Sequence, residues 1–429
     1  MAGLHIDLLR HALIIVLCGS YLVGSTFFTL MFIPPFALFG WVFLPIVACS
    51  VIVGAYSIAW IVYLYKGQTD RSFNLPYNPK RIFKINYAFF SFLWTSIIMF
   101  VPLFAEYGYF KFFVLGKRIR RIIKEDIYYG SNSNSNRLDV YIPDTSKYPQ
   151  MFDAAFHPVI VFIHGGSWGS GDKIWYSLLA LRLRQMGYVV VVPNVTLYPK
   201  AKVDVMLSDI KRTLVWTKRF ISKFGGDPNK IYIMGHSSGA HLASLVTVRD
   251  SIIKSQTMEG RVSSNLNDID PELELPKIAG LILMAGIYDI RRHYLWETKR
   301  GVEEISPMGR VMGDSPESFE MNSPTLLLQS AMKDREVDFN KLKKLMPQKI
   351  LLIHGDMDET VPLESTLRFN LVLSDLNIED LRLRIMNGME HSDPVVGMMY
   401  SPFRNRFTPH LISELGNFML QDDLEIEEY

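Results

Sequence analysis

Cysteine is nearly absent from this sequence: the 429 residues include two, Cys18 and Cys49, and the region after residue 110 has none. Small secreted domains that depend on several disulfides are therefore excluded, and the C-terminal region must fold without such cross-links. The Asn-x-Ser/Thr sequon is equally scarce, with one example at Asn194 inside an expected core strand. Both scarcities favour a C-terminal region that faces the cytosol.

Charge is missing from the N-terminal region. Residues 12–65 contain no Asp, Glu, Lys or Arg. Because a helix needs about 20 apolar residues to cross a bilayer, this run predicts two spans, 12–33 and 37–65, separated at Pro34 and Pro35. A cleaved signal peptide is the alternative, but its apolar core measures about 7–15 residues, and this run is several times longer.

A third uncharged stretch, 85–105, lies between two basic clusters. The clusters are Lys66, Arg71, Lys80, Arg81 and Lys84 before it, and Lys111, Lys117, Arg118, Arg120, Arg121 and Lys124 after it. Basic residues beside apolar spans favour the cytoplasmic side and anionic headgroups. Two interpretations therefore stay open: the stretch crosses the membrane, or it is an interfacial segment whose insertion is limited by Pro102 and Glu106.

The charge of the two parts of the chain differs in sign. Residues 1–124 hold 12 basic and 3 acidic residues, whereas the remainder holds 33 and 40. A basic nucleic-acid surface is therefore not expected, since the positive charge flanks lipid-length segments and the folded remainder is acidic. The sequence also lacks an internal repeat, a phosphate-binding loop and any His, Cys and carboxylate cluster with metal-ligand spacing, so no metal or cofactor is expected.

After the basic segment, short β-branched runs alternate with helical patterns, which predicts an α/β fold with a mostly parallel sheet. The expected strands are 127–129 and 138–142, an opening hairpin around a turn at 131–136, then 159–163, 188–192, 231–234, 279–284, 350–353 and 381–385. The expected helices lie near 173–186, 203–222, 240–248, 363–375 and 408–420. This organisation predicts a membrane anchor at 1–118 and a second domain at 119–429. Long connections near 251–276 and 290–347 are expected to form a lid or cap.

Gly235-His236-Ser237-Ser238-Gly239 fits the pattern G-x-S-x-G and joins an expected strand directly to an expected helix. Small glycines allow the sharp, strained turn that exposes the hydroxyl of a nucleophilic serine. Ser237 is the predicted nucleophile. Ser238 lies one place beyond the turn, where its backbone N–H suits the stabilisation of an oxyanion.

His164-Gly165-Gly166-Ser167-Trp168 follows another expected strand, about 70 residues earlier. Glycines let backbone N–H groups approach a developing oxyanion closely. Gly165, Gly166 and Ser167 are therefore predicted to line an oxyanion hole or to bind substrate. An ordinary Gly-Gly turn is the alternative interpretation, and the G-x-S-x-G turn downstream favours the functional one.

The acid and the base are expected after the last two strands. Asp356, Asp358 and Glu359 compete for the acid, which orients an imidazole. In hydrolases whose nucleophile lies in a G-x-S-x-G turn, the catalytic residues follow the chain order Ser, then Asp or Glu, then His. The base must therefore follow the acid, and His354 is excluded. Of the two later histidines, His391 lies in a loop at a strand end and His410 lies within a helix, which favours His391.

Together these motifs resemble the α/β-hydrolase superfamily, in particular its hormone-sensitive-lipase-like and carboxylesterase branches. The segment 224–231 leading into the G-x-S-x-G turn is very similar to theirs, and their acid-loop pattern H-G-x-x-D-x-x-V-P falls on 354–362. This resemblance implies that Asp358 is the acid. It also implies an eight-stranded, mostly parallel sheet with flanking helices and a helical cap, here preceded by transmembrane helices.

Within that superfamily the chain is most similar to membrane-bound prenylcysteine methylesterases. These also carry apolar N-terminal spans, a G-G-x-W segment and a late His followed by Ser/Thr-Asp, which is His391-Ser392-Asp393 here. The resemblance implies a membrane-bound esterase of the endoplasmic reticulum or Golgi that hydrolyses prenylcysteine methyl esters or another lipid-like ester through an acyl-enzyme. The departure is His164: the form H-G-G-S-W also occurs in arylformamidases and steryl-ester deacetylases.

Two functions of other kinds stay open at this stage. One is a binding module that keeps the hydrolase fold without catalysis, although such proteins typically lose one of the three catalytic residues. The other is acyl transfer to an alcohol instead of to water, which uses the same three residues.

Overall fold

The computed structural model describes residues 2–66, 75–130, 135–143, 156–256, 273–303, 305–399 and 405–424. The chain forms two compact units: Met1–Val101 with Leu295–Pro307, and Pro102–Tyr294 with Met308–Tyr429. The predicted anchor, 1–118, extends past the boundary between the units. The grouping of Leu295–Pro307 with the N-terminal helices was not predicted.

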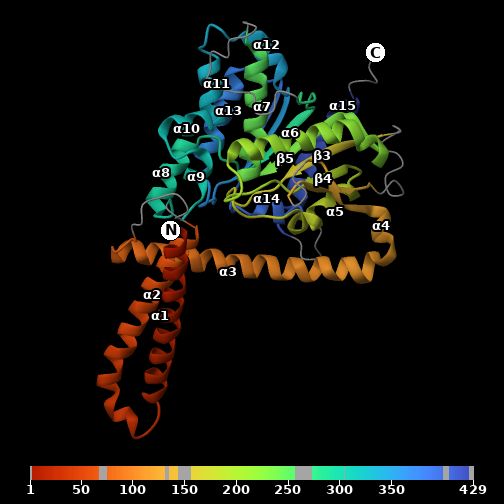
Figure 1. The fold of residues 1–429 in the computed structure, drawn as a ribbon. Helices are drawn as coiled ribbons and strands as arrows, with labels where there is room; N and C mark the ends of the chain where they lie inside the picture. The colour runs from red at the N-terminus through yellow and green to blue at the C-terminus, as the bar shows by residue number, and fades with distance from the viewer. Residues whose placement is uncertain are drawn as a thin grey trace. The chain divides into compact units, whose positions relative to one another are not determined.

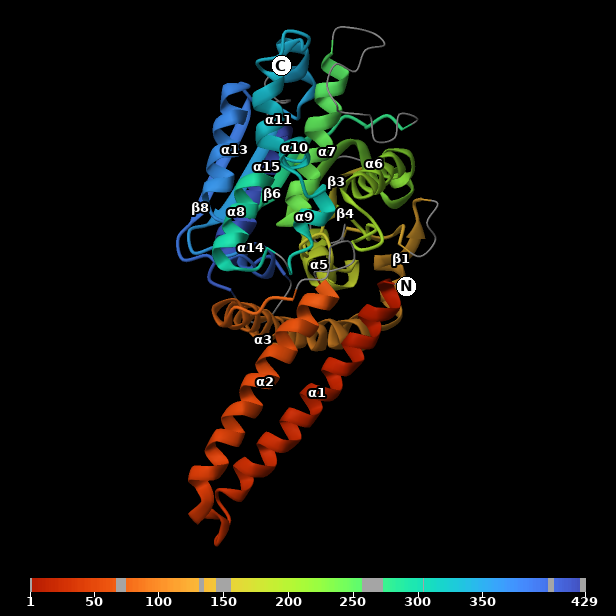
Figure 2. The ribbon, with the colours of Figure 1, turned by 60° about the vertical axis from the view of Figure 1, so that its left-hand side comes forward.

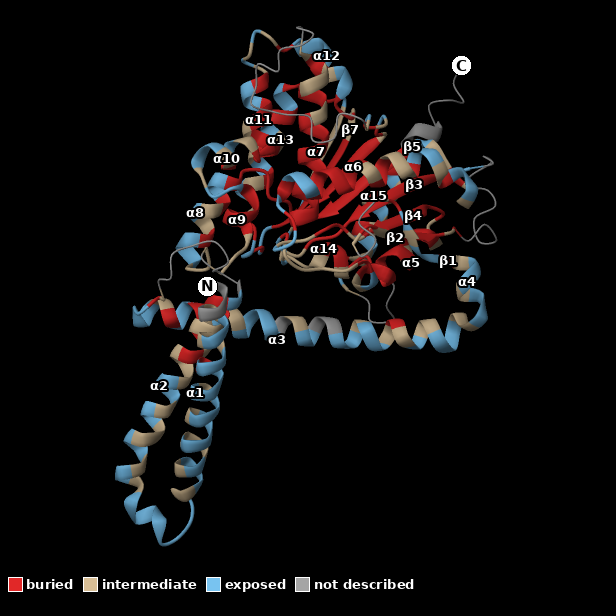
Figure 3. Cartoon of the chain, in the orientation of Figure 1, coloured by how far each residue is buried: buried red, intermediate tan, exposed pale blue. Residues whose placement is uncertain are grey.

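The first unit contains an antiparallel hairpin of α1 (Ala2–Leu30) and α2 (Gly40–Lys66), with the short 3₁₀ helix η1 (Phe36–Phe39) before α2 (Figure 2). The Arg10 side chain donates to the Leu64 carbonyl at 2.5 Å, so the start of α1 lies beside the end of α2. Most side chains of the hairpin are exposed (Figure 3). The helix α3 (Pro79–Tyr109) begins in this unit. All three helical segments are long and apolar enough to cross a membrane.

The second unit is built on an eight-stranded sheet in the order β1-β2-β4-β3-β5-β6-β7-β8. Figure 1 labels three neighbouring strands of this sheet, β5, β3 and β4. β2 pairs antiparallel with both β1 and β4, and every other pair is parallel. The predicted mostly parallel eight-stranded sheet is therefore confirmed. The strands are β1 (Ile123–Tyr128), β2 (Arg137–Tyr141), β3 (His157–Ile163), β4 (Val189–Pro193), β5 (Gly226–His236), β6 (Gly280–Met284), β7 (Lys349–Gly355) and β8 (Asp380–Met386).

Helices cover both faces of the sheet, because its central strands are apolar on both sides. Val159 and Val161 of β3 pack into one core with α6, α7 and α13, whereas Ile160 and Phe162 pack into a second core with α5, α14 and α15. These helices are α5 (Ser177–Gln185), α6 (Val203–Phe220), α7 (Ser238–Ser255), α13 (Glu364–Asp375), α14 (Asp393–Val396) and α15 (Thr408–Leu424). Burial on both faces is the usual setting of parallel strands.

The predicted insertion at 290–347 is helical. It contains α8 (Ile290–Arg300), α9 (Met308–Met312), α10 (Pro316–Met321), α11 (Pro324–Ala331) and α12 (Phe339–Leu345). Proline at the first position and a Ser315–Ser318 capping box fix the start of α10, since both satisfy or remove the unpaired N–H groups of a first turn. In the predicted insertion at 251–276, residues 257–272 lie outside the described residues, as do 131–134 of the expected hairpin turn.

Short helical turns complete the second unit. The π-helical turn η2 (Phe110–Leu115), the 3₁₀ turn η3 (Gly116–Arg118) and α4 (Ile119–Ile122) follow α3 and lead into β1. The 3₁₀ turns η4 (Lys173–Tyr176) and η5 (Ile221–Phe224) precede α5 and β5. Lys173 of η4 is buried and forms a 2.6 Å ion pair with Asp139 of β2, which ties the segment after β3 to the edge of the sheet.

Candidate active site

Four loops of the second unit carry the predicted site residues, and each begins where a strand ends. His164 follows β3, Ser237 follows β5, Asp358 lies three residues after β7, and His391 lies five residues after β8. Because these strands are parallel members of one sheet, their carboxyl ends meet at the same edge. This edge is where open α/β sheets bind ligands.

The turn at Ser237 is sharp and strained. Ser237 adopts φ 55° and ψ −123° between the end of β5 and the start of α7, a region that side chains other than glycine rarely occupy. Its backbone N–H donates to the Met284 carbonyl of the neighbouring strand at 2.9 Å, which holds the turn in place. A Cβ atom on Gly239 would lie 2.1 Å from the Ile163 carbonyl oxygen, so only glycine lets α7 approach β3 this closely.

Ser237, His391 and Asp358 form one chain of hydrogen bonds. The Ser237 Oγ lies 2.9 Å from His391 Nε2, and His391 Nδ1 lies 2.7 Å from an oxygen of Asp358. Because a carboxylate only accepts, the ring donates from Nδ1, and Nε2 is left as the acceptor of the serine hydroxyl. The structure therefore brings together three residues that are 33 to 154 positions apart in the sequence.

Asp358 is held as a buried carboxylate. Its Oδ1 accepts the backbone N–H groups of Thr360 and Val361 at 2.9 and 2.8 Å, and its Oδ2 lies 3.3 Å from His354 Nε2. Burial alone would raise the pKa of Asp358, but the nearby His391 and the hydrogen bonds from His354, His391 and Val361 outweigh it and hold the pKa well below its usual range. The carboxylate therefore stays charged at neutral pH.

The residues that competed for the roles of acid and base are exposed or make other contacts. Asp356 is exposed and accepts the Gly388 N–H at 2.6 Å, and Glu359 is also exposed. His354 is fully buried: its Nε2 donates to the Val361 carbonyl at 3.0 Å, and its Nδ1 lies 2.6 Å from the Thr366 hydroxyl. His354 thus braces the acid loop. His410 is exposed on α15.

His236, the residue before Ser237, supports the loop of His391. Its Nε2 donates to the His391 carbonyl at 2.8 Å, and the two rings lie 5.0 Å apart. Burial, reinforced by the neighbouring His391, lowers the pKa of His236 to about 3. The His236 ring therefore stays neutral, and it positions the His391 loop without taking up a proton.

The loop after β3 brings glycine and serine N–H groups to the same edge. Gly166 adopts φ +128°, Ser167 φ 51° and Trp168 φ 58°. A Cβ atom on Gly166 would lie 2.1 Å from the Ser170 carbonyl oxygen, and the Gly166 carbonyl accepts the backbone N–H groups of Gly169 and Ser170. Within the described residues, the N–H groups of Gly166 and Ser167 donate to no backbone acceptor.

Comparisons with known proteins place this chain in a family. The family described as BD-FAE matches residues 138–373, which is more than half of the chain and contains both Ser237 and Asp358. The chain belongs to the BD-FAE family. Together with this match, the relatives and solved structures described next confirm the predicted resemblance to the α/β-hydrolase superfamily and, within it, to prenylcysteine methylesterases.

Three proteins illustrate the relationship. Isoprenylcysteine alpha-carbonyl methylesterase ICME of Arabidopsis thaliana is 29% identical over 69% of this chain and 61% of its own length. Kynurenine formamidase of Danio rerio is 31% identical over 45% of this chain and 55% of its own length. The crystal structure of esterase B from Lactobacillus rhamnosis shares the fold, with a TM-score of 0.54 at 15% identity over 78% of this chain and 99% of that chain. This BD-FAE chain therefore spans about three fifths of the length of the methylesterase.

A buried network that the sequence did not reveal joins three segments of this BD-FAE protein: the loop after β3, α7 and the helical insertion. The Trp168 indole N–H donates to His241 Nδ1 at 3.1 Å, and His241 Nε2 donates to the Asn322 carbonyl at 2.8 Å. Arg249 in turn donates to the Asn322 side chain at 2.8 Å. The helical insertion is thereby tied to α7 and to the loop after β3. The indication in the sequence was His241 itself, a polar residue between Ala240 and Leu242.

Replacing His241 by glutamine is expected to reduce the loss of folding stability that occurs as the pH falls. Burial lowers the pKa of His241 to about 4, so between pH 6.5 and 4 the unfolded chain binds a proton that the folded chain excludes. The contribution of His241 to the free energy of unfolding is fully present above pH 6.5. It falls by at most about 1.4 kcal/mol per pH unit as the pH drops toward 4. Glutamine can accept from Trp168 and donate to Asn322 without titrating.

The measurement is the thermal unfolding midpoint of detergent-solubilised protein between pH 7.5 and 4, the range set by the usual and the lowered histidine pKa. Exposed His410→Gln is the matched control and should follow the wild type across the whole range. An identical slope for His241→Gln and wild type between pH 6.5 and 4 would contradict the prediction.

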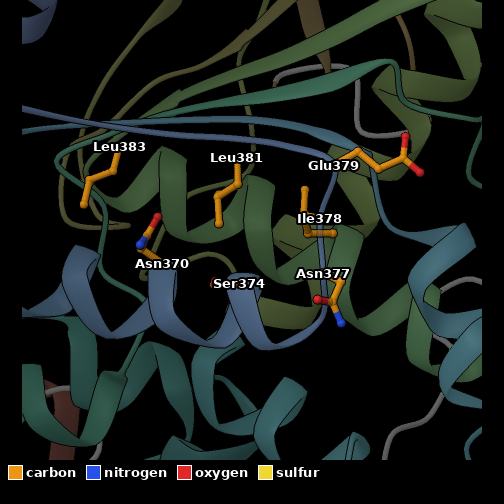
Figure 4. A pocket seen from close by; sticks show the side chains of 7 residues that line it. All are labelled: Asn370, Ser374, Asn377, Ile378, Glu379, Leu381 and Leu383. Atoms are coloured by element: carbon orange, nitrogen blue, oxygen red, sulfur yellow. The ribbon is translucent and has the colours of Figure 1, made fainter.

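The structure also contains an open hollow of about 460 Å³ between α13 and β8 (Figure 4). None of the hydrogen-bonded triad lines it. The lining residues are Asn370, Ser374, Asn377, Ile378, Glu379, Leu381 and Leu383. Among the described residues, no three His, Cys, Asp or Glu side chains gather in a way that could hold a metal ion.

Proposed function

We propose that this protein is a membrane-anchored serine hydrolase that cleaves carboxylic esters through an acyl-enzyme, with prenylcysteine methyl esters as its substrates. The observation that carries this proposal is the hydrogen-bonded chain from Ser237 through His391 to Asp358. A serine hydroxyl at a strained turn, an imidazole oriented to accept its proton and a buried carboxylate behind that imidazole are the parts that acyl transfer requires.

In the first half-reaction, His391 Nε2 takes the Ser237 hydroxyl proton as Oγ forms a bond to the ester carbonyl carbon. The carbonyl oxygen becomes an oxyanion. When the intermediate collapses, the bond from the carbonyl carbon to the methoxy oxygen breaks, and His391 returns the proton to that oxygen. Methanol leaves and the acyl group stays on Ser237. Asp358 keeps the ring in the required tautomer and stabilises its charged form.

In the second half-reaction, water replaces the alcohol. His391 takes a proton from the water as the water oxygen bonds to the acyl carbon. The bond to Ser237 Oγ then breaks, and Oγ recovers the proton from His391. The product that leaves is the prenylcysteine with a free C-terminal carboxylic acid. Each step conserves charge and atoms without a cofactor.

The N–H groups of Gly166, Ser167 and Ser238 are the proposed oxyanion donors. Ser238 begins α7, where the first-turn N–H groups have no partner within the helix. The Gly165 N–H is a weaker candidate, because it is directed to the Tyr176 hydroxyl. Burial raises the pKa of Tyr176, whereas this backbone hydrogen bond lowers it.

Gly166→Ala is expected to lower kcat by about 10²- to 10³-fold, the usual loss when an oxyanion donor is removed. The added methyl group would collide with the Ser170 carbonyl, and φ +128° is unfavourable for alanine. The rearranged loop would no longer present its N–H groups. Gly416→Ala in α15, where nothing lies within 4 Å of the added atom, is the control for ester hydrolysis assays. An unchanged kcat for Gly166→Ala would show that this loop does not bind the oxyanion.

The substrate class is supported by two observations. The relatives with isoprenylcysteine methylesterase names match about 70% of this chain. Helices long and apolar enough to cross a membrane precede the hydrolase unit, and a lipid-modified substrate would be concentrated in that membrane. We further propose that α1 and α2 anchor the protein in the endoplasmic reticulum or Golgi with the hydrolase unit toward the cytosol. The basic residues beside these helices favour that side.

The substrate test is competition for fluorophosphonate labelling of the detergent-solubilised protein. The competitors are a prenylcysteine methyl ester, a steryl acetate, a short-chain aryl ester and an N-formyl aryl amine, the last chosen because a kynurenine formamidase is a relative. The prenylcysteine ester should protect best and should release methanol. Best protection by the formyl amine or the steryl acetate would replace the substrate class, and absence of labelling of the folded protein would overturn the hydrolase itself.

A further inference from the structure

We propose that α3 does not cross the bilayer but lies along its cytosolic surface, with an exposed apolar stripe in the interface and its flanking basic residues on anionic headgroups. This inference rests on the proposed function in one respect, the anchoring of the α1–α2 hairpin in a membrane.

A distant segment of the chain packs where α2 ends and α3 begins. Ile305 packs against the small core formed by Ala59, Val62, Ile82 and Ile85. Polar contacts join the same segment to the first turns of α3: Arg81 pairs with Glu303 at 3.4 Å, and Lys84 donates to the Lys299 carbonyl at 3.3 Å. Leu295–Pro307 therefore lies on the side of the membrane where α3 starts.

The path of the chain then determines whether α3 can cross the bilayer. The residues on either side of this segment, Tyr294 and Met308, belong to the second unit, which contains the end of α3 and the chain after it. If α3 crossed the bilayer, the chain would have to cross back before residue 295 and cross again after residue 307. Every described helix suited to spanning ends by Ile122, and the later apolar segments are strands and helices buried around the sheet. Only a non-crossing α3 agrees with this path.

Exposed apolar side chains cover much of α3, Phe92, Leu93 and Ile98 among them, and seven of them line up along the helix. Buried or packed positions Ile82, Ile85, Leu103 and Tyr107 fall on one face. Away from the packed positions, these exposed apolar side chains recur at regular spacings of three and four residues, which place them on a single stripe. The stripe is Phe83, Tyr87, Phe90, Trp94, Ile97, Val101 and Phe104.

The composition of the stripe and its ends identifies the partner as a lipid surface. Three of the seven side chains are Phe, and the stripe also contains Trp94 and Tyr87, the aromatic types that gather at membrane interfaces. One basic cluster reaches into the first turns of the helix and the other follows it. A crossing helix would put one cluster on the disfavoured side, whereas a helix in the interface puts both on the cytosolic side, where anionic lipids attract them.

Single-cysteine labelling tests the path of the chain. Cys18→Ser and Cys49→Ser remove the natural cysteines, and Leu38→Cys, Lys80→Cys and Lys117→Cys report on η1, the start of α3 and the segment after it. A membrane-impermeant maleimide is applied to sealed microsomes with the cytosolic face outward. Lys80→Cys and Lys117→Cys should label at once, and Leu38→Cys only after permeabilisation. Protection of Lys117→Cys beside a labelled Lys80→Cys would overturn the inference. Immediate labelling of Leu38→Cys would instead overturn the spanning hairpin.

Spin labels measure the depth of α3 in either case. Nitroxides are placed one at a time on cysteines at Phe83, Phe90, Ile97 and Phe104 in full-length protein reconstituted into phosphatidylcholine vesicles with phosphatidylserine. Collisions with oxygen and with a water-soluble nickel chelate then report depth. All four positions should lie at one shallow depth. A profile that deepens toward the middle of the helix and becomes shallow again at Phe104 would show that α3 spans.

Discussion

Ser237→Ala is expected to remove ester hydrolysis almost completely, with kcat/KM lower by about 10⁵- to 10⁶-fold. The reason is geometric: the Ser237 Oγ is the atom that lies 2.9 Å from His391 Nε2 at the strained turn. Without it no acyl-enzyme can form, and the remaining oxyanion donors assist attack by water only weakly. Initial rates with the best ester from the competition experiment measure the loss.

The control for this substitution is Ser374→Ala, the same change at an exposed serine of α13. Fluorophosphonate should label the wild type and Ser374→Ala equally and should not label Ser237→Ala. Because alanine at this site removes one buried hydroxyl, a far-ultraviolet circular dichroism spectrum establishes that Ser237→Ala is folded. Full labelling of folded Ser237→Ala would mean that the nucleophile lies elsewhere.

Asp358→Asn is expected to lower kcat by about 10⁴-fold while the protein stays folded. The present carboxylate accepts from His391 Nδ1 at 2.7 Å and from two backbone N–H groups. An asparagine that turns its amide N–H₂ toward His391 forces the ring into the tautomer that carries its proton on Nε2, where it cannot accept the Ser237 proton. Stabilisation of the charged imidazole is lost as well.

Asp356→Asn is the matched control, because it makes the same change two residues away on the same loop. The Asp356 carboxylate accepts the Gly388 N–H, a bond that an amide oxygen can replace. Its activity should stay close to that of the wild type when both are assayed across the neutral pH range. A larger loss in Asp356→Asn than in Asp358→Asn would reassign the acid.

The buried strands of the sheet could be predicted from the sequence because parallel strands covered on both faces require continuous apolar, β-branched runs. The expected strand at 188–192 is β4, Val189–Pro193, and the expected strand at 350–353 lies within β7. Periodicity was less informative for β5, which begins at Gly226 instead of residue 231. Gly226–Lys230 is polar and contains glycine and proline, which is typical of a turn, yet Gly226 pairs with His157.

The triad residues could be proposed from the sequence because each follows a strand, and parallel strands bring their carboxyl ends together. Choosing Asp358 over Asp356 required a family pattern, since spacing alone left both possible. The structure supplies a physical difference: Asp358 is buried with several donors, and Asp356 is exposed. The link between His241 and Asn322 could not be predicted, because it joins residues 81 positions apart through a backbone carbonyl.

The packing of Leu295–Pro307 among the N-terminal helices has a consequence for how the hydrolase unit could be released from a membrane. A protease that nicks the chain after α3, near η3 (Gly116–Arg118), cuts the peptide link to the hairpin. The downstream fragment still contains Ile305 and Glu303, whose partners stay in the upstream fragment. The two pieces should therefore remain associated after one cut. Release of the downstream fragment from the hairpin should also require the loss of the contacts that Ile305 and Glu303 make.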